Sequence, residues 1–196
     1  MLDLFIIRPG IWQDGTVSDD ALSLLRTHLA NKNLVKHCFS VEACMRAMAA
    51  RLGFDPEPWA LAGLLHDLDY ELTGMSADLH TTEAVKILEA RGLSPEILHA
   101  VQAHAGKAPC LSPMDWAIYA IDPLTGLIIA AVLMHPEKKI KAIDVEFIKR
   151  RYKEKSFAKG ARREDIEACR NLGLDLDEFI AVCLTAMQGI DAELGL

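Results

Sequence analysis

The chain has 196 residues, of which 51% are hydrophobic and 25% are charged, and its formal net charge is -7. This length is enough for one compact domain with a sizeable core, and the composition is that of a soluble globular protein. A negative net charge excludes broad electrostatic attraction to nucleic acid, so no nucleic-acid partner is expected. Abundant Ala and Leu together with few aromatic residues favour helices over strands.

The N-terminus and the cysteines indicate a cytoplasmic protein. The first residues lack the basic start and apolar core of a secretory signal peptide. No Cys-x-x-Cys pair occurs and the number of cysteines is odd, which favours free thiols in a reducing compartment. The five cysteines are Cys38, Cys44, Cys110, Cys169 and Cys183.

In chain order, residues 1–17 read as an irregular N-terminal arm containing Pro9, Gly10 and Gly15. Residues 18–196 read as one helical domain with a C-terminal helical extension, because apolar residues recur at helical spacing and no strand-rich run or repeat occurs. Ser18 is a plausible cap for the first helix. Helices are predicted over about 19–30, 33–52, 56–67, 80–91, 95–105, 113–134, 144–154, 163–172 and 175–194. The fold class is therefore all-α, with a single domain.

The helix predicted over 113–134 is apolar enough to require a comparison with a membrane span. Its apolar stretch from residue 117 to 134 contains Asp122, Pro123 and Gly126. A carboxylate near the middle of a spanning helix costs roughly 2.5–3.5 kcal/mol on insertion scales. We therefore expect a core helix that carries one functional aspartate, and no membrane partner.

Several histidines are predicted on helix faces that otherwise bury apolar side chains. They are His37, His66, His80 and His104. Asp122 shares its face with Ile118, and a buried carboxylate needs a cation or strong donors nearby. Core packing explains any one of these residues, but not the whole set. Imidazole and carboxylate groups are ligands that suit Fe, Mn, Co, Ni and Zn, so the pattern predicts a metal site.

The order of His37, the adjacent pair His66-Asp67, and Asp122 resembles the H…HD…D signature of the HD-domain phosphohydrolases. The stretch Ala-Leu-Ala-Gly-Leu-Leu-His-Asp at 60–67 is typical of the central helix of that family, and residues 119–128 resemble its last ligand helix. His80 and His104 fall where subfamilies with two metals place their additional histidines. The resemblance covers roughly residues 19–165.

The resemblance implies a role for each matching residue. One divalent metal would be bound by His37, His66, Asp67 and Asp122. A second would be bound by His80 and His104, with Asp67 bridging the two ions. Two such ions can hold a bridging hydroxide as nucleophile and stabilise the phosphoryl oxygens during an in-line displacement. The sequence leaves open whether one or two ions bind, and which of Fe, Mn, Co, Ni or Zn they are.

Three residues are candidates for the catalytic machinery: Asp67, Asp69 and Lys107. Asp69 follows the His-Asp pair and would orient a ligand histidine or a water molecule; a polar loop after the helix is the alternative. Lys107 would contact a phosphate, or it is a solvated loop lysine. The lysine- and arginine-rich segment 138–163 reads either as a solvated helix face or as a rim that attracts a phosphorylated substrate.

The expected activity is hydrolysis of a phosphate ester or anhydride of a small metabolite or nucleotide. The sequence Gly-Lys-Ala-Pro at 106–109 replaces the Gly-Tyr-Pro motif of cyclic-di-GMP phosphodiesterases, which argues against that subfamily. Two alternatives remain open: a mixed-valent diiron oxygenase of the HD class, and a non-catalytic nucleotide-binding regulatory module. The chain is expected to be a monomer or a homodimer.

Overall fold

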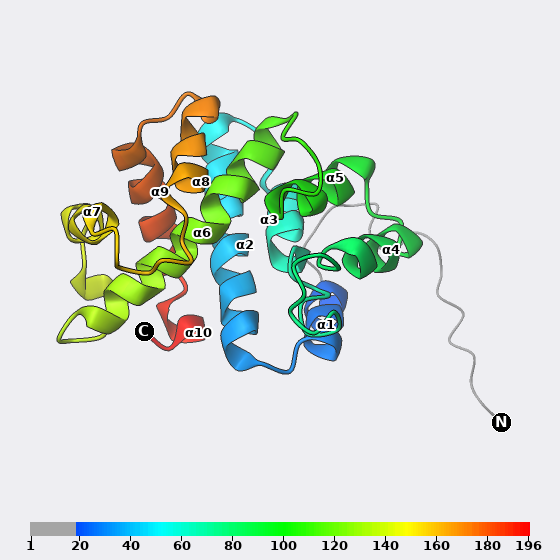
Figure 1. The fold of residues 1–196 in the computed structure, drawn as a ribbon, viewed down its shortest axis with the longest axis horizontal. Coiled ribbons are helices and arrows are strands. Elements are labelled where there is room, and N and C mark those ends of the chain that lie inside the picture. The colour runs from blue at the N-terminus through cyan, green and yellow to red at the C-terminus, as the bar shows by residue number, and fades with distance from the viewer. Residues whose placement is uncertain (1–18) are drawn as a thin grey trace.

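The computed structural model describes residues 19–196, and this part of the chain is helical and contains no strand (Figure 1). The predicted arm at 1–17 and the predicted cap at Ser18 lie outside the described residues. The helices are α1 (Asp19–His28), α2 (Lys32–Leu52), α3 (Pro56–Leu65), α4 (Thr82–Ala90), α5 (Pro95–His104), α6 (Pro113–Met134), α7 (Val145–Lys153), α8 (Arg163–Glu167), α9 (Leu176–Gln188) and α10 (Asp191–Leu194). Short 3-10 helices span Ile140–Ala142 and Ala168–Leu172. The prediction of an all-α fold is confirmed.

The two longest helices have well-defined ends. At the start of α2, the Asn31 side chain accepts a hydrogen bond from the Asn33 backbone N–H. Gly53 ends α2 in a left-handed conformation with φ 80°, which glycine adopts without the steric cost that a Cβ brings. At the start of α6, the side chains of Ser112 and Asp115 form a capping box. These local signals explain why α2 and α6 lie close to their predicted ranges.

The region after α3 differs from the prediction. Helix α3 ends at Leu65, so the His66-Asp67 pair begins a series of turns instead of closing the helix. Helix α4 begins only at Thr82, because Thr81 has a left-handed φ of 73° that cannot belong to a helix. The prediction that His80 lies on a helix is therefore wrong. It lies in the turn that precedes α4.

The last predicted helix is divided into two. Asp175 caps α9, because its side chain accepts a hydrogen bond from the Glu178 backbone N–H. The helix ends at Gln188, and Ile190 departs from helical geometry with φ -118° and ψ 27°. The short α10 follows and packs against α2. Helix α9 also packs on α2, so the C-terminal region is part of the domain core.

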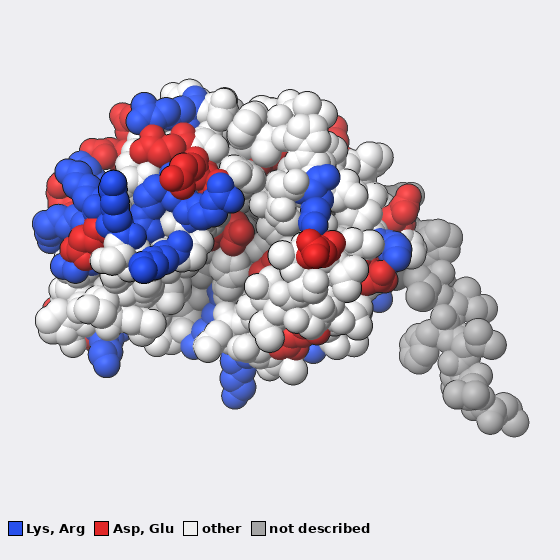
Figure 2. Space-filling view, viewed as in Figure 1, with Lys and Arg blue, Asp and Glu red and all other residues white. Residues whose placement is uncertain are grey.

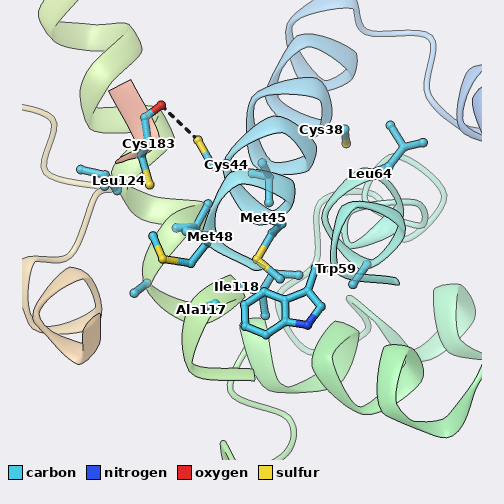
Figure 3. Close-up of a cluster of buried hydrophobic side chains, with 14 of the residues drawn as sticks. Cys38, Cys44, Met45, Met48, Trp59, Leu64, Ala117, Ile118, Leu124 and Cys183 are labelled. Atoms are coloured by element: carbon cyan, nitrogen blue, oxygen red, sulfur yellow. Dashed lines mark hydrogen bonds between the residues drawn. The ribbon is translucent and has the colours of Figure 1, made fainter. Parts of the chain in front are cut away.

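Helices α2 and α6 run through the centre of the domain, and the other helices surround them (Figure 1). Their buried side chains meet in the core drawn in Figure 3, where Met45 and Met48 of α2 lie beside Ile118 of α6 and Trp59 of α3. Helix α6 has the length and composition of a membrane-spanning helix, and 56% of its apolar window is buried inside the domain. It packs against α2, α5 and α8, as the prediction of a core helix requires.

Helices α2 and α3 make a close contact at Gly63. A Cβ atom at this position would lie 2.9 Å from the Val41 carbonyl oxygen and 3.0 Å from the Glu42 Cα atom. Both are backbone atoms of α2, which cannot move aside as a flexible side chain does. A glycine is therefore needed for the two helices to approach this closely. The contact fixes α2, which carries His37, relative to the His66-Asp67 pair that follows α3.

We expect Gly63→Ala to destabilise the fold by about 1–3 kcal/mol, the range typical of overpacking in a well-packed core. Urea unfolding followed by circular dichroism measures this change. Gly126→Ala is the matched control, because a Cβ there meets no described atom within 4 Å and helix propensity should stabilise α6 by roughly 0.5–1 kcal/mol. Equal stabilisation by both substitutions would contradict the close contact.

Candidate metal centre

The six predicted metal ligands converge on one site although they come from five parts of the chain. They are His37 of α2, His66 and Asp67 after α3, His80 before α4, His104 at the end of α5, and Asp122 of α6. His66, Asp67, His80 and His104 are buried, whereas His37 and Asp122 are partly exposed. The site therefore lies at the base of an opening and not in a closed core.

One half of the site is formed by His37, His66, Asp122 and one oxygen of Asp67. The His37 Nε2 atom lies 2.9 Å from Asp122 Oδ1 and 3.2 Å from His66 Nε2. Asp67 Oδ2 lies 3.7 Å from His37 Nε2 and 3.5 Å from His66 Nε2. The donor atoms of His37, His66 and Asp122 all lie within 4.8 Å of one another, close enough to hold one ion.

The other half of the site is formed by His80, His104 and the second oxygen of Asp67. Asp67 Oδ1 lies 3.1 Å from His80 Nε2 and 3.6 Å from His104 Nε2. The two histidine Nε2 atoms are 3.0 Å apart. The Asp67 carboxylate thus directs one oxygen to each group of histidines, as a bridging ligand does.

Backbone carbonyl groups orient two of the histidines. His66 Nδ1 lies 2.8 Å from the Gly63 carbonyl oxygen, and His104 Nδ1 lies 2.6 Å from the Val101 carbonyl oxygen. A carbonyl can only accept a hydrogen bond, so each Nδ1 must carry the proton. In the neutral ring, Nε2 is then left with its lone pair facing the site.

Polar side chains orient the other two histidines in the same way. The Thr125 hydroxyl donates to the Asp122 carbonyl oxygen, and so accepts from His37 Nδ1 at 3.2 Å. The Asp69 carboxylate accepts from His80 Nδ1 at 2.9 Å. When their rings are neutral, all four histidines consequently present Nε2 lone pairs to the site. Facing lone pairs repel one another unless a proton or a metal cation lies among them, and such outer contacts are typical of metal-ligating histidines.

Burial and the neighbouring charged groups shift the pKa values of the histidines and of the Asp67 carboxyl group at the site. Burial lowers the pKa of His66 to about 4. Burial also acts on His80, but its hydrogen bonds to Asp67 and Asp69 outweigh that effect and raise its pKa to about 9. Burial opposes ionisation of Asp67, yet the neighbouring histidines hold the pKa of its carboxyl well below the usual range. The site therefore keeps its carboxylate negative, which favours a bound cation.

These residues fit a divalent transition metal. The donors are imidazole nitrogens and carboxylate oxygens, the set that Fe, Mn, Co, Ni and Zn accept. The donor atoms of His66, Asp67 and His104 form a second group within 4.8 Å that shares His66 with the first. Because the two groups share His66, their donor atoms together could hold one or two ions.

Asp69 is fully buried and holds His80 in place. Besides His80 Nδ1, its oxygens accept hydrogen bonds from the backbone N–H groups of Thr81, Glu83 and Ala84 at 3.0–3.1 Å. The same carboxylate thus caps the start of α4 and orients a ligand histidine. Of the two roles expected for Asp69, this geometry favours the orientation of a histidine.

Lys107 lies outside the group of six ligands. Its side chain is exposed, and its Nζ donates to the Asp78 carbonyl oxygen at 3.2 Å. This bond joins the loop after α5 to the loop before α4. A catalytic role for Lys107 stays a prediction. His99 of α5 also lies outside this group and pairs with Asp115 at 3.0 Å, and Asp115 belongs to the capping box of α6.

Two residues at the site were not singled out from the sequence. Thr125 lies three residues after Asp122 on α6, a spacing that places both on one face and so offered a signal. Tyr70 packs its ring edge-to-face against His80, with ring centroids 5.1 Å apart. Tyr70 also lines the mouth of the site, a cavity of about 330 Å³ to which Leu34 and Ala105 contribute apolar walls.

The charged segment 138–163 carries both signs of charge at the α7–α8 end of the molecule (Figure 2). Lys149 lies 2.6 Å from Asp177, and Arg151 lies 3.0 Å from Glu154. Acidic neighbours therefore neutralise part of the positive charge that the sequence concentrates here. The structure favours a solvated face over a purely basic rim.

A comparison with protein families shows the family of this chain. The HD domain family matches residues 34–170, a range that includes all six ligand residues. The chain belongs to the HD-domain family. This is a family of metal-dependent phosphohydrolases, so the coarse assignment made from the sequence is confirmed.

Curated relatives with the same HD domain are named ribonuclease Y. The protein is 33% identical over 99 residues to ribonuclease Y 2 of Levilactobacillus brevis, covering 48% of this chain and 18% of that protein. It is 32% identical over 140 residues to ribonuclease Y of Thermosipho melanesiensis, covering 68% of this chain and 27% of that protein. The similarity thus spans only a minor part of these longer proteins. No solved structure matches the chain significantly.

We expect Asp69→Asn to weaken Mn²⁺ binding by about 10–100-fold, as is typical when a residue that orients a metal ligand is lost. An asparagine amide NH₂ cannot accept the hydrogen bonds that one Asp69 oxygen receives from Glu83 and Ala84. Isothermal titration calorimetry with metal-depleted protein measures the loss. Asp78→Asn, a change of the same type at an exposed loop position, is the control. Equal affinities of the two variants would show that Asp69 does not support the site.

Proposed function

We propose that this HD-domain protein hydrolyses a phosphate ester or anhydride of a small metabolite or nucleotide. The observation that carries the proposal is the Asp67 carboxylate, whose two oxygens face two separate histidine groups. This arrangement suits a site that binds two divalent ions side by side. When bound, such ions supply Lewis acidity toward phosphoryl oxygens and lower the pKa of a bound water.

The chain's own residues would prepare the site for this chemistry. His37, His66, Asp67 and Asp122 would hold one ion, and His80 and His104 the other. The pinned Nδ1 atoms keep the imidazole rings from turning, so the ligands need little reorganisation when substrate binds. Leu34 and Tyr70 would exclude water from one side of the mouth.

Two residues outside the six predicted ligands would support the reaction. Asp69 would act by positioning His80, and Lys107 would meet a phosphate group only if the loop after α5 moved toward the site.

Five free cysteines, four of them buried, support a reducing cytoplasmic location. The substrate would be small, because the mouth of the site has a volume of only about 330 Å³.

The names of the relatives support a second candidate, the hydrolysis of RNA phosphodiester bonds. Ribonuclease Y proteins share the HD-domain region with this chain. The net charge of -7 argues against a long nucleic-acid substrate, since such binding depends on clustered positive charge. A short oligonucleotide would still bring its phosphodiester to the same ions.

The test is metal-dependent release of phosphate or nucleotide by the Mn²⁺-loaded protein from a panel of phosphomonoesters, nucleotides and a short RNA. We expect turnover that chelation abolishes and Mn²⁺ restores. Asp67→Ala and His66→Ala should each lower kcat/KM by at least about 100-fold, because each removes a ligand from the ions that activate water and stabilise charge. Asp78→Asn serves as the control for an acidic residue removed from the neighbouring loop.

Retained turnover in folded Asp67→Ala and His66→Ala proteins would refute the proposal. Cleavage of RNA without release of phosphate from any small ester would favour the second candidate. Circular dichroism of each variant distinguishes loss of function from loss of fold.

A further inference from the structure

A second cavity opens from the metal centre along α6, and we call it the α6 pocket. It has a volume of about 400 Å³, and His37, His104 and Asp122 form its inner end. Tyr119 and Asp165 line it farther out. Tyr119 precedes Asp122 by three residues on α6, which places their backbone positions ~4.5 Å apart along the helix axis. The pocket thus begins at the metal ligands and extends about one helical turn from them.

Small residues leave this space open. Pro123 and Gly126 of α6 and Ala158, Gly160 and Ala161 of the loop before α8 line the pocket. A Cβ atom at Gly126 or at Gly160 would meet no described atom within 4 Å. The volume is at the small end of the range for ligand sites, which suits a group the size of a sugar.

Arg163 supports the loop wall of this pocket. Its guanidinium donates to the backbone carbonyl oxygens of Phe157, Ala158 and Ala161 at 2.6–3.1 Å. The same guanidinium also donates to the Tyr152 carbonyl oxygen at the end of α7. These hydrogen bonds hold an irregular segment in one conformation, so the outer wall is preformed.

The outer end of the pocket carries hydrogen-bond acceptors. The Tyr119 phenol donates to Asp165 Oδ1 at 2.7 Å, so the phenol oxygen is left to accept. Asp165 Oδ2 lies 3.3 Å from Arg162 Nε, and the Asp165 side chain is 16% exposed. An ionised carboxylate has about four acceptor positions, so these two partners do not saturate it.

The charge distribution favours one orientation of a bound phosphate ester. The described residues that line the α6 pocket include no lysine or arginine. A second anionic group at the outer end would meet the Asp165 carboxylate and would be repelled, because the exposed Arg162, which lies outside the lining, offsets that charge only weakly. The phosphate would therefore lie at the metal centre, and an uncharged or cationic donor group would lie near Asp165 and Tyr119.

We propose that the α6 pocket binds the organic part of the substrate, and that Asp165 and Tyr119 accept hydrogen bonds from its hydroxyl or amino groups. The inference rests on the proposed phosphohydrolase function, because it divides the substrate between the metal centre and the pocket. It narrows the substrate class to small phosphomonoesters of a sugar, polyol or amino alcohol.

The experiment compares four probes with the full-length Mn²⁺-loaded protein. Ribose 5-phosphate presents hydroxyl donors, O-phosphoethanolamine presents an amine, phenyl phosphate presents no donor, and 3-phosphoglycerate presents a second anionic group. Both phosphate release and the ligand-induced rise in unfolding temperature are measured. We expect a preference for ribose 5-phosphate, O-phosphoethanolamine or both. Comparison of these two probes shows whether the pocket binds a hydroxyl or an amino group.

Asp165→Asn should lower the preference for the donor-bearing probe over phenyl phosphate by about tenfold, as loss of a hydrogen bond to a charged group does. Glu164→Gln is the matched control, because Glu164 is the exposed neighbour on the same short helix. If the preference for the donor-bearing probe over phenyl phosphate differed by less than twofold between Asp165→Asn and Glu164→Gln, the inference would be overturned. So would a wild-type preference for phenyl phosphate or 3-phosphoglycerate.

Gly126→Leu tests the position of the pocket separately. Gly126 lines the α6 pocket, so a leucine that fills part of this space should raise KM for the preferred probe by about tenfold or more. The unfolding temperature should not fall, because a Cβ at this position meets no described atom within 4 Å and leucine has a higher helix propensity than glycine. An unchanged KM would place the organic part elsewhere.

Different results would refute the phosphohydrolase function and the assignment of the α6 pocket. Absence of phosphate release from every probe by the wild-type protein would refute the phosphohydrolase function. The shifts in unfolding temperature would still show whether donor-bearing ligands occupy the pocket. Turnover without the expected selectivity would refute only the assignment of the α6 pocket.

Discussion

The structure is organised around the ionised carboxylate of Asp67. Removing a carboxylate from water is costly unless opposite charge or hydrogen-bond donors surround it. Here histidines from four different helices or turns supply that environment. The fold must bring α2, α3, α5 and the start of α4 together at one point, and the close contact of α2 with α3 at Gly63 makes this possible. The site and the core therefore depend on the same helix packing.

Much of this could be predicted from the sequence because helices and metal ligands have local signatures. Helical periodicity placed α2, α5 and α6, and His66-Asp67 with its leading apolar stretch indicated the metal centre. The position of His80 could not be predicted, because Asp69, eleven residues earlier, sets the start of α4 through tertiary hydrogen bonds. The pairing of Tyr119 with Asp165 also depends on how α8 packs against α6, which no local pattern encodes.

The HD-domain match covers the region that holds the six predicted metal ligands. A shared set of ligands fixes the type of chemistry more strongly than it fixes the substrate. Selectivity must then arise from what surrounds the ions. In this protein those surroundings are a mouth to which Leu34, Tyr70 and Ala105 contribute, and a pocket along α6 that Tyr119 and Asp165 line.

The double role of Asp69 links metal binding to the folding of one helix. The same carboxylate orients His80 and accepts the first backbone N–H groups of α4, so any force on His80 is transmitted directly to that helix. Ligands that bind only the native state stabilise the parts of the structure they engage. Metal binding would thus slow amide hydrogen exchange in α4, although none of the six predicted ligands lies on that helix. The exchange rate of the α4 amides would therefore show whether metal is bound at the centre.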